Sequence, residues 1–368
     1  MPKILLVLSC DMSGISRLPA VLARHGLHVT VLTAPGHLLA LTRRSSARVP
    51  CAPGEAATAD ALLRHLGSGS AAYDLVVLGD DPLLGRIARL EGASHLLSCP
   101  AIADLAWSKC AFATLHAEED LPSPATCAVR TAEEARAAAG RIGYPLIFKS
   151  ATGFASSGVH RCDDAAQLDR HLGLLDGDQP WLVQQFVEGP VGTVDALFWH
   201  GRPVAWTSAL VTATSNGPFR SSTARRFHRL AGLEPLLHRI GRRSGLHGFA
   251  GLDVILRHDG SPALLEMNCR PTIGHSLGAG AGSISAACSP VCWLDARRSP
   301  RRNGRMMGGS SASSPRMSAA VSGSAIAVER SPGCCCRRAG GCFPGRSRAC
   351  SSASSAISSH GCGAGSPP

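Results

Sequence analysis

Short, continuous apolar runs alternate with helix-like stretches at the start of this 368-residue chain. Residues 4–8 (ILLVL), 28–32 (HVTVL) and 75–78 (LVVL) lack the polar alternation of a strand that faces water on one side. A helical stretch at about residues 15–25 joins the first two runs. Strands buried on both faces and separated by helices are typical of a parallel sheet. We therefore expect an α/β domain here.

The turn after the first strand limits what this domain can bind. Residues 9–14 (SCDMSG) lack the Gly-x-Gly-x-x-Gly fingerprint that seats a dinucleotide on a helix. The domain is therefore expected to be Rossmann-like, with no signal for NAD. From about residue 104 the pattern changes to α+β, and a capping box at Thr131 and Glu134 opens an alanine-rich helix.

Two features of the sequence bear on the cellular location of the protein. The apolar run at residues 4–8 is too short for a secretory signal, and no run is as long as a membrane-spanning helix. Seven cysteines are scattered before residue 283 without a Cys-x-x-Cys pair, which is typical of reduced thiols. We expect a cytoplasmic protein with no membrane partner.

Positive charge collects at the end of the chain. The net charge is +11, but residues 283–368 hold eleven arginines against two acids, while residues 1–282 hold 26 basic and 24 acidic residues. The tail has no nucleic-acid-binding motif and no interleaved aromatic residues, so we expect no nucleic acid partner. It also lacks apolar periodicity, which predicts a disordered C-terminal tail.

The composition of this tail allows two origins. It is rich in Ser, Gly, Ala, Arg, Cys and Pro and contains no lysine. Natural disordered tails are usually rich in Glu, Lys, Gln and Ser and poor in Cys. The eight cysteines therefore favour out-of-frame translation of a GC-rich gene over a natural tail. In that case the activity of this polypeptide is open.

Lysine is scarce throughout, with three lysines against thirty-four arginines. Two of the three, Lys109 and Lys149, stand where a phosphate site could use them. Lys109 lies on an expected helix at residues 107–116, and Lys149 lies near the end of an expected strand at residues 144–150. An ammonium group is a compact point charge suited to phosphate oxygens, whereas a guanidinium is a planar fork. Ordinary solvated lysines are the alternative.

A loop of small residues, 152–159 (TGFASSGV), follows Lys149 directly. Gly153 and Gly158 can adopt conformations closed to other residues and let backbone N–H groups approach phosphate oxygens. A plain hairpin turn is the alternative, but the lysine before the loop favours a phosphate site.

A later apolar run, residues 181–187 (WLVQQFV), predicts a buried strand. It ends at Glu188 and Gly189. The backbone of such an edge can hydrogen-bond an adenine ring, so this strand is a candidate nucleotide-binding edge.

The most detailed geometry lies in residues 248–270 (GFAGLDVILRHDGSPALLEMNCR). Asp259 and Gly260 predict a two-residue hairpin turn between two apolar strands. Counting outward from this turn places Asp253 opposite Glu266. Directly opposed side chains lie about 5 Å apart, where two carboxylates destabilise each other unless a cation compensates.

Asn268 lies two residues beyond Glu266 and therefore on the same face of its strand. Its amide oxygen and the carboxylates of Asp253 and Glu266 make a ligand set suited to Mg²⁺. Arg270 continues this face and could reach a phosphate group. The alternative is that both acids point to solvent and repel each other weakly.

These features, in this order, resemble the ATP-grasp superfamily. That family has a lysine on an early helix, a strand lysine before a glycine-rich loop, a strand edge at adenine, and an acid followed by Glu-x-Asn-x-Arg. The matching positions are Lys109, Lys149 with its loop, residues 184–189 (QQFVEG), Asp253 and residues 266–270 (EMNCR). Each motif alone is weak, but the ordered set is specific and covers about residues 1–282.

The resemblance implies ATP and two Mg²⁺ (or Mn²⁺) ions as cofactors. It also implies four parts: a Rossmann-like domain that precedes the ATP-grasp fold (1–100), two ATP-grasp subdomains (101–187 and 188–282), and the tail (283–368). Nucleotide contacts are expected from Lys109, Lys149, Gly153, Ser156, Ser157, Gly158, Gln185, Phe186, Val187 and Glu188. Metal ligands are expected to be Asp253, Glu266 and Asn268. Catalytic roles are expected for Arg270 and Lys149.

Two positions depart from the family pattern. Many members have a glutamate that binds ribose where this chain has Val191, so the ribose contact must come from Glu188 or from elsewhere. Position 185 is Gln, where members often have Glu.

The resemblance implies a carboxylate–amine ligase, which phosphorylates a small carboxylate with ATP and lets an amine displace the phosphate. Arg225 and Arg226 are weaker candidates for holding the substrate carboxylate. A carboxylase, a small-molecule kinase and a nucleotide-binding protein without turnover remain alternatives. Nothing in the sequence selects the carboxylate, the amine or the pathway, and a homo-oligomer stays open.

Overall fold

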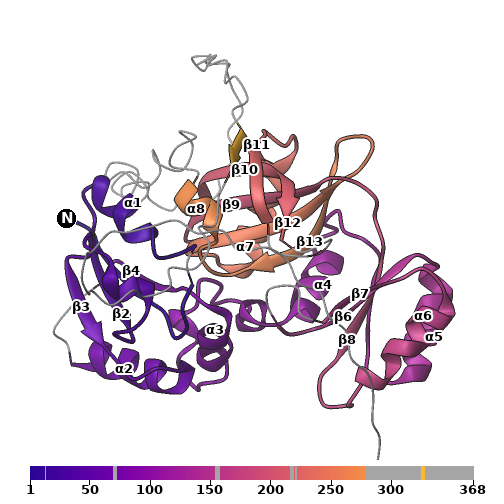
Figure 1. Ribbon diagram of the computed structural model, residues 1–368, viewed down its shortest axis with the longest axis horizontal. Coiled ribbons are helices and arrows are strands. Elements are labelled where there is room, and N and C mark those ends of the chain that lie inside the picture. The colour runs from indigo at the N-terminus through magenta and orange to yellow at the C-terminus, as the bar shows by residue number, and fades with distance from the viewer. Residues whose placement is uncertain are drawn as a thin grey trace, which may run out of the picture. The chain divides into compact units, whose positions relative to one another are not determined.

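Three β-sheets follow one another along the chain (Figure 1). The computed structural model describes residues 1–12, 14–68, 73–153, 158–215, 219, 222–277 and 325–327. The first sheet is parallel, and the second and third are antiparallel. The expected change from an α/β to an α+β fold is therefore confirmed, while the boundaries of the four parts stay a prediction.

The N-terminal sheet has the strand order β3-β2-β1-β4. Its strands are β1 (Lys3–Val7), β2 (His28–Thr33), β3 (Ala47–Pro50) and β4 (Leu75–Leu78). Its helices are α1 (Leu18–Arg24), α2 (Glu55–Gly67) and α3 (Asp81–Ala88). The chain runs from β1 outward to β3 and then returns to the other side of β1, so the order of strands reverses between β1 and β4. In open parallel sheets, ligands bind at the carboxyl ends of the strands beside such a point.

The middle sheet has the order β5-β8-β6-β7 and a core of its own. Its strands are β5 (Thr126–Val129), β6 (Leu146–Ser150), β7 (Val159–Cys162) and β8 (Trp181–Gln185). The helices α5 (Ala132–Ile142) and α6 (Ala165–His171) cover one face, where Leu146 and Phe148 are buried. Because side chains alternate along a strand, Lys149 points to the opposite face.

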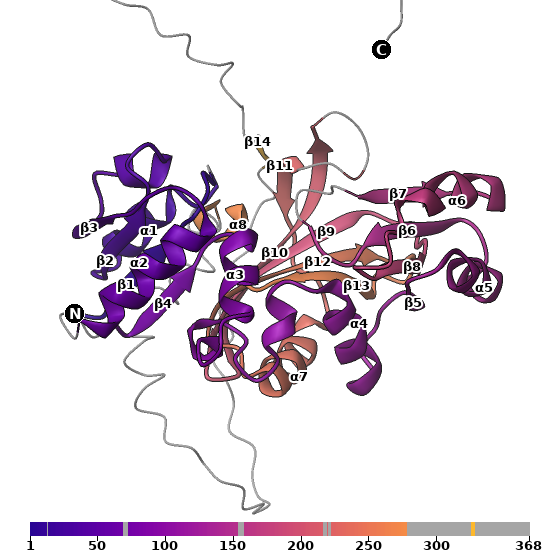
Figure 2. The same cartoon turned by 90° about the horizontal axis from the view of Figure 1, so that it is seen from below.

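The C-terminal sheet has the order β13-β12-β9-β10-β11-β14. Its strands are β9 (Val191–Trp199), β10 (Arg202–Thr214), β11 (Ser222–Phe227), β12 (Gly248–Leu256), β13 (Pro262–Asn268) and β14 (Ala325–Ala327). Its helices are α7 (Leu233–Ser244) and α8 (Ile273–Leu277). A further helix, α4 (Lys109–Glu118), packs against β13 (Figure 2). This sheet and the N-terminal sheet contribute to one continuous hydrophobic core.

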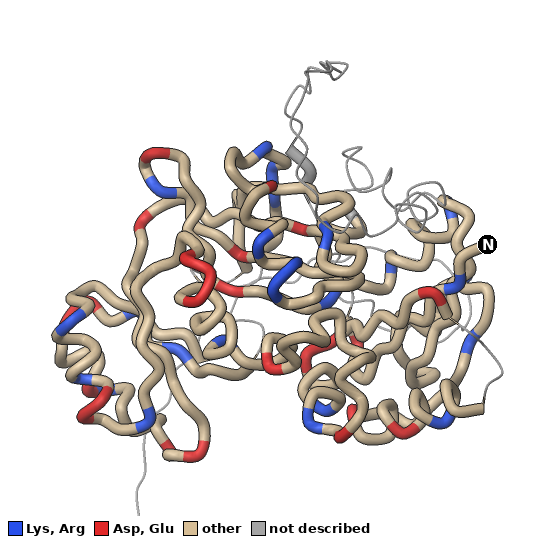
Figure 3. Tube along the Cα trace, turned by 180° about the vertical axis from the view of Figure 1, so that it is seen from behind, with Lys and Arg blue, Asp and Glu red and all other residues tan. Residues whose placement is uncertain are grey.

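The tail expected to be disordered, residues 283–368, lies outside the described residues except for β14, which pairs with β11. Basic and acidic residues are interspersed over the rest (Figure 3), as the balanced charge of residues 1–282 predicts. Within the part of the chain that is described, no helix is both long and apolar enough to cross a membrane. The cytoplasmic location stays a prediction.

The expected capping box is confirmed at the start of α5. The Thr131 hydroxyl accepts a hydrogen bond from the Glu134 N–H at 3.2 Å, and the Glu134 carboxylate accepts one from the Thr131 N–H at 3.4 Å. Both bonds satisfy N–H groups that the first turn of a helix leaves without a partner.

Replacing Thr131 should destabilise α5 and, with it, the middle sheet that this helix covers. We expect Thr131→Ala to lower the free energy of unfolding by about 1 kcal/mol, because one N–H at the helix start loses its acceptor. Urea unfolding followed by circular dichroism measures the change. Thr131→Ser keeps the hydroxyl and should stay close to the wild type; equal losses in both variants would contradict the capping role.

Candidate active site

The β12–β13 hairpin places Asp253 directly opposite Glu266, as predicted. The turn itself differs from the prediction. The Arg257 N–H donates the last backbone hydrogen bond between the strands to the Ser261 carbonyl, which leaves a loop of three residues, 258–260, instead of two. This shifts the register by one residue near the turn, and a bulge at Leu265 shifts it back before Glu266 is reached. The pairing was therefore predicted correctly although the turn was not.

Polar groups line one face of the C-terminal sheet around this pair. Asp253 pairs with Thr193 of β9, and Asp195 lies two residues further along β9, so all three side chains share a face. Arg225 of β11 reaches the same face, because its guanidinium donates to the Thr193 hydroxyl at 3.2 Å. This face, which also carries Glu266 and Asn268, is the candidate site.

The two opposed carboxylates make this face electrostatically unfavourable without a cation. Burial, and after it the charge of Glu266, raise the pKa of Asp253 to about 7. Among the described residues, no three His, Cys, Asp or Glu side chains gather closely enough to hold a metal ion by themselves. A divalent cation would therefore need the amide of Asn268 and oxygens of a bound ligand besides the two carboxylates.

Lys109, the first residue of α4, lies beside this pair. Its Nζ is 3.8 Å from Glu266 Oε1 and donates a hydrogen bond to the Gly153 carbonyl at 2.8 Å. Its own N–H is bonded to the Ala151 carbonyl at 2.8 Å. The helix start, the glycine loop and the carboxylate face therefore meet at this one side chain.

Lys149 is buried on the inner face of β6, which is the face opposite α5 and α6. Its Nζ donates to Gln184 Oε1 at 3.0 Å and approaches the carbonyl of Leu265, the bulge residue, at 3.5 Å. Burial lowers its pKa to about 8, and nearby Glu266 and Asp253 partly offset this effect. A lysine held this way faces β13 with little freedom to move.

Gln184 is the glutamine of β8 whose side chain points toward Lys149, while the nucleotide contact expected of Gln185 stays a prediction. Its amide is held by the Thr126 hydroxyl at 2.9 Å, and its side chain is buried. Gln185 is exposed and accepts a weak bond from the Ala125 N–H at 3.4 Å. Because side chains alternate along a strand, Gln184 lies on the face of β8 opposite the buried Val183.

The other nucleotide candidates are only partly described. Gly153 and Gly158 have φ of 105° and 71°, the left-handed conformations expected of them, while Ser156 and Ser157 lie outside the described residues. The residues after β8, Phe186, Val187 and Glu188, continue without regular structure. The Phe186 ring lies 4.3 Å below the Arg161 guanidinium, and Glu188 is exposed.

Arg270 is bound to a residue of the N-terminal sheet. Its Nε and Nη2 donate to the two carboxylate oxygens of Asp81, at 2.8 and 2.6 Å, and Nη2 also donates to Asn268 Oδ1 at 3.2 Å. Burial alone would lower the pKa of Arg270, but these bonds and the charge of Asp81 raise it. The oxygen expected to bind a metal is thus in contact with Arg270.

Asp81 and Asp195 are two site residues that the sequence did not single out. Asp81 opens α3 at the carboxyl end of β4, and only the fold brings it to Arg270. Asp195 is buried, lies 3.8 Å from Arg225 Nη1 and accepts a hydrogen bond from the Thr272 hydroxyl. No motif marks either position, although a buried aspartate in an apolar strand is itself unusual.

Comparison with known proteins agrees with this geometry. Residues 108–274 match the family described as ATP-grasp domain. Over 136 residues the chain is 32% identical to the carbamoyl phosphate synthase large chain of Corynebacterium glutamicum, a match that covers 35% of this chain and 12% of the other. Over 272 residues it is 26% identical to the D-alanine–D-alanine ligase of Ralstonia nicotianae, covering 68% and 80%.

A solved structure shares the fold. The L-amino acid ligase from Bacillus licheniformis aligns with a TM-score of 0.53 at 19% identity, covering 75% of this chain and 69% of that one. An N-terminal parallel α/β domain followed by two antiparallel sheets is the architecture of an ATP-grasp protein. Residues 108–274 of this chain belong to the ATP-grasp domain family.

The bond between Arg270 and Asp81 should be measurable. We expect Asp81→Asn to lower the free energy of unfolding by roughly 1–3 kcal/mol, because a charge-assisted, partly buried pair is lost. A double-mutant cycle with Arg270→Gln measures the coupling by urea unfolding. Asp60→Asn, at an exposed position on α2, is the matched control; purely additive effects at 81 and 270 would contradict the pairing.

The lowered pKa of Lys149 predicts a pH dependence. The unfolded chain binds a proton at this lysine up to about pH 10.5, but the folded chain releases it near pH 8, so stability should rise with pH between these values. Lys149→Met should remove this part of the rise, whereas Lys3→Met at an exposed position should keep it. Urea unfolding at about pH 8, 9 and 10 measures both slopes; equal slopes for wild type and Lys149→Met would disprove the shift.

Proposed function

We propose that the chain is an ATP- and Mg²⁺-dependent ligase that activates a small carboxylate as an acyl phosphate for attack by an amine. The observation that carries this proposal is the meeting of Lys109 and Lys149 with the opposed Asp253 and Glu266. Cations beside paired carboxylates suit a nucleoside triphosphate that binds with a divalent cation. The match to a D-alanine–D-alanine ligase over 68% of the chain supports this class of reaction.

The carboxylate face fits a magnesium site. Asp253 and Glu266 face each other, burial and the charge of Glu266 raise the pKa of Asp253 to about 7, and Asn268 lies on the same face. These three residues would hold Mg²⁺. When bound, the ion would neutralise charge on the phosphate oxygens.

The basic residues would bind and orient the phosphates. Lys109 already bridges the glycine loop and Glu266, so a small movement of its Nζ toward solvent would bring it to a phosphate oxygen. Lys149, held by Gln184, would contribute a fixed charge from the opposite side. Gly153, Ser156, Ser157 and Gly158 would cover the phosphates, and residues 185–188 would contact the nucleoside.

The reaction would proceed in two displacements. A carboxylate oxygen of the substrate attacks the γ-phosphorus, and ADP leaves with the electron pair of the broken P–O bond. The amine nitrogen then attacks the acyl carbon, phosphate leaves with the electrons of the C–O bond, and the nitrogen loses a proton to solvent. Arg270 would stabilise charge on the transferred group with its Nη1, while Asp81 holds its other nitrogens. Arg225 is the candidate for the substrate carboxylate.

A carboxylase that activates bicarbonate is the second candidate. The match to a carbamoyl phosphate synthase large chain favours it, although that match spans only 12% of the relative's length. Release of ADP that depends on bicarbonate, and not on an amino acid, would select this reaction.

Trapping with hydroxylamine tests the ligase directly. With Mg-ATP and a panel of amino acids, we expect hydroxamate from at least one carboxylate, and Glu266→Gln should reduce its rate roughly a hundredfold or more. Glu91→Gln, at an exposed position outside the site, should leave the rate unchanged. Hydroxamate formation that survives Glu266→Gln would rule out the proposed metal ligands.

A further inference from the structure

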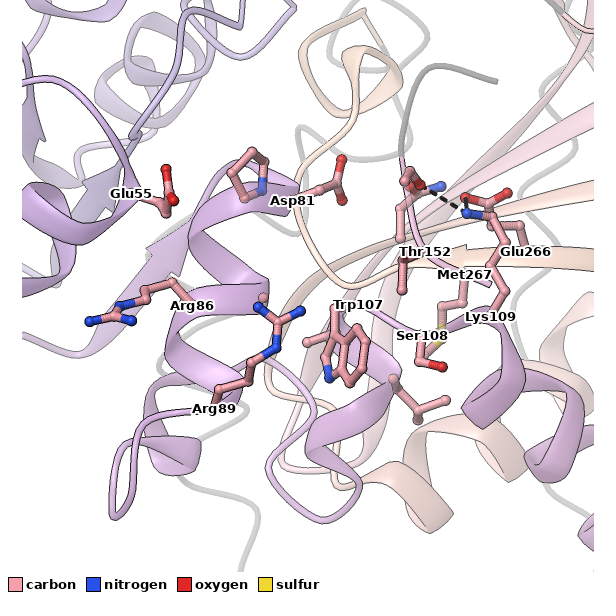
Figure 4. A pocket seen from close by; sticks show the side chains of 16 residues that line it. Glu55, Asp81, Arg86, Arg89, Trp107, Ser108, Lys109, Thr152, Glu266 and Met267 are labelled. Atoms are coloured by element: carbon pink, nitrogen blue, oxygen red, sulfur yellow. Dashed lines mark hydrogen bonds and ion pairs between the residues drawn. The ribbon is translucent and has the colours of Figure 1, made fainter. Parts of the chain in front are cut away.

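A pocket of about 400 Å³ connects the candidate site with the N-terminal sheet (Figure 4). One wall is α3, whose first turn lies at the carboxyl ends of the parallel strands. The other wall is the start of α4 and the end of β13. The pocket therefore lies at the point where the strand order reverses, where open parallel sheets bind ligands.

The two ends of this pocket, here called the α3 pocket, have different chemistry. One end lies at the candidate site, where phosphoryl transfer is proposed, and is lined by Lys109, Gly153, Glu266 and Asn268. Arg86, in the last turn of α3, and Arg89, the residue that caps the end of this helix, line the other end. A small molecule that reacts at the first end would extend toward these guanidinium groups.

Arg89 is positioned by its neighbours. Its guanidinium lies 4.7 Å above the Trp107 ring, in cation–π geometry. The guanidinium also lies directly over Gly85, one turn before it, where a methyl group would be in ordinary van der Waals contact with both terminal nitrogens at 3.8 Å. The indole N–H of Trp107 is bonded to Asp104 at 3.2 Å, which fixes the ring. The flat face of the guanidinium thus packs on the indole ring, and its N–H edge can bind a ligand.

The charges around the pocket favour an anion at this end. Among the residues that the structure describes, neither Arg86 nor Arg89 forms an ion pair. Of the acids on the wall, Asp81 is bound to Arg270 and Glu266 lies near Lys109. Glu55, at the start of α2, is the remaining carboxylate, so two guanidinium groups face one acid.

We propose that the α3 pocket binds a carboxylate of an amino-acid-like substrate, separate from the carboxylate that is activated, with Arg89 as the principal contact and Arg86 as a second. This rests on the ligase function proposed above and adds a substrate class to it. The group could belong to the amine substrate or be a second carboxylate of the acid substrate. A planar guanidinium edge matches a carboxylate in both cases.

Matched pairs of compounds distinguish these sources. Isothermal calorimetry with Mg²⁺ and a non-hydrolysable ATP analogue compares glycine with glycinamide and alanine with alaninamide for the amine, and glutamate with glutamine and aspartate with asparagine for the acid. In either the amine set or the acid set, we expect the compound with the free carboxylate to bind roughly tenfold to a hundredfold more tightly than its amide. Arg89→Met should remove this preference, Arg89→Lys should restore part of it, and Arg86→Met should reduce it less.

Arg24→Met, at an exposed position on α1 away from the pocket, is the control and should bind as the wild type does. Thermal melting shows whether each variant is folded, and Arg89→Lys replaces Arg89→Met if the latter is not. Equal affinity for both members of every pair, or a preference that survives loss of Arg89, would overturn the proposal.

Calorimetry and hydroxylamine trapping together distinguish failure of this binding site from failure of the proposed ligase function. A preference that depends on Arg89 without hydroxamate from any compound would keep the binding site and remove the ligase reaction. Hydroxamate formation with a KM that Arg89→Met leaves unchanged for every compound would keep the ligase and remove this binding site.

Discussion

Two carboxylates, Asp253 and Glu266, face each other across one hairpin. Because they repel each other, the positively charged groups nearby are needed to stabilise the site. Burial and mutual repulsion raise the pKa of Asp253, so the folded chain holds this pair at a cost unless positive charge is near. Lys109 approaches from α4 and Lys149 from the middle sheet. Their convergence from separate elements is what a site for a polyphosphate and a divalent cation requires.

The N-terminal domain reaches this site through the ion pair between Asp81, at the start of α3, and Arg270. Asp81 binds Arg270 with both oxygens, and Arg270 in turn contacts Asn268 beside the carboxylates. The same helix, α3, carries Arg86 and ends at Arg89, and both arginines lie on the wall of the pocket. A substrate bound at the N-terminal sheet and the nucleotide at the C-terminal sheet would therefore meet across α3 and β13.

Much of this arrangement could be predicted, but not always for the right reason. Asp253 opposes Glu266 as expected, because a three-residue loop and a bulge at Leu265 cancel each other. That bulge has a second effect, since its carbonyl is the one that approaches Lys149. Along β8, the alternation of side chains places the side chain of Gln184, and not that of Gln185, toward Lys149. The nucleotide contact expected of Gln185 stays a prediction. Motif spacing locates a segment, whereas burial decides which residue of it faces the site.

The sequence by itself determined the order of the sheets and the capping box of α5, because these depend on local periodicity and helix-capping chemistry. It also located the two lysines and the opposed carboxylates, although the bulge that keeps the carboxylates opposed is not encoded by the turn. Only the tertiary structure decided that Asp81 would bind Arg270, that Asp195 would lie beside Arg225, and that Arg89 would rest on Trp107. Those contacts join residues that are far apart in the chain or on different elements. They form because packing the sheets around a shared core brings together side chains whose pairing no local pattern encodes.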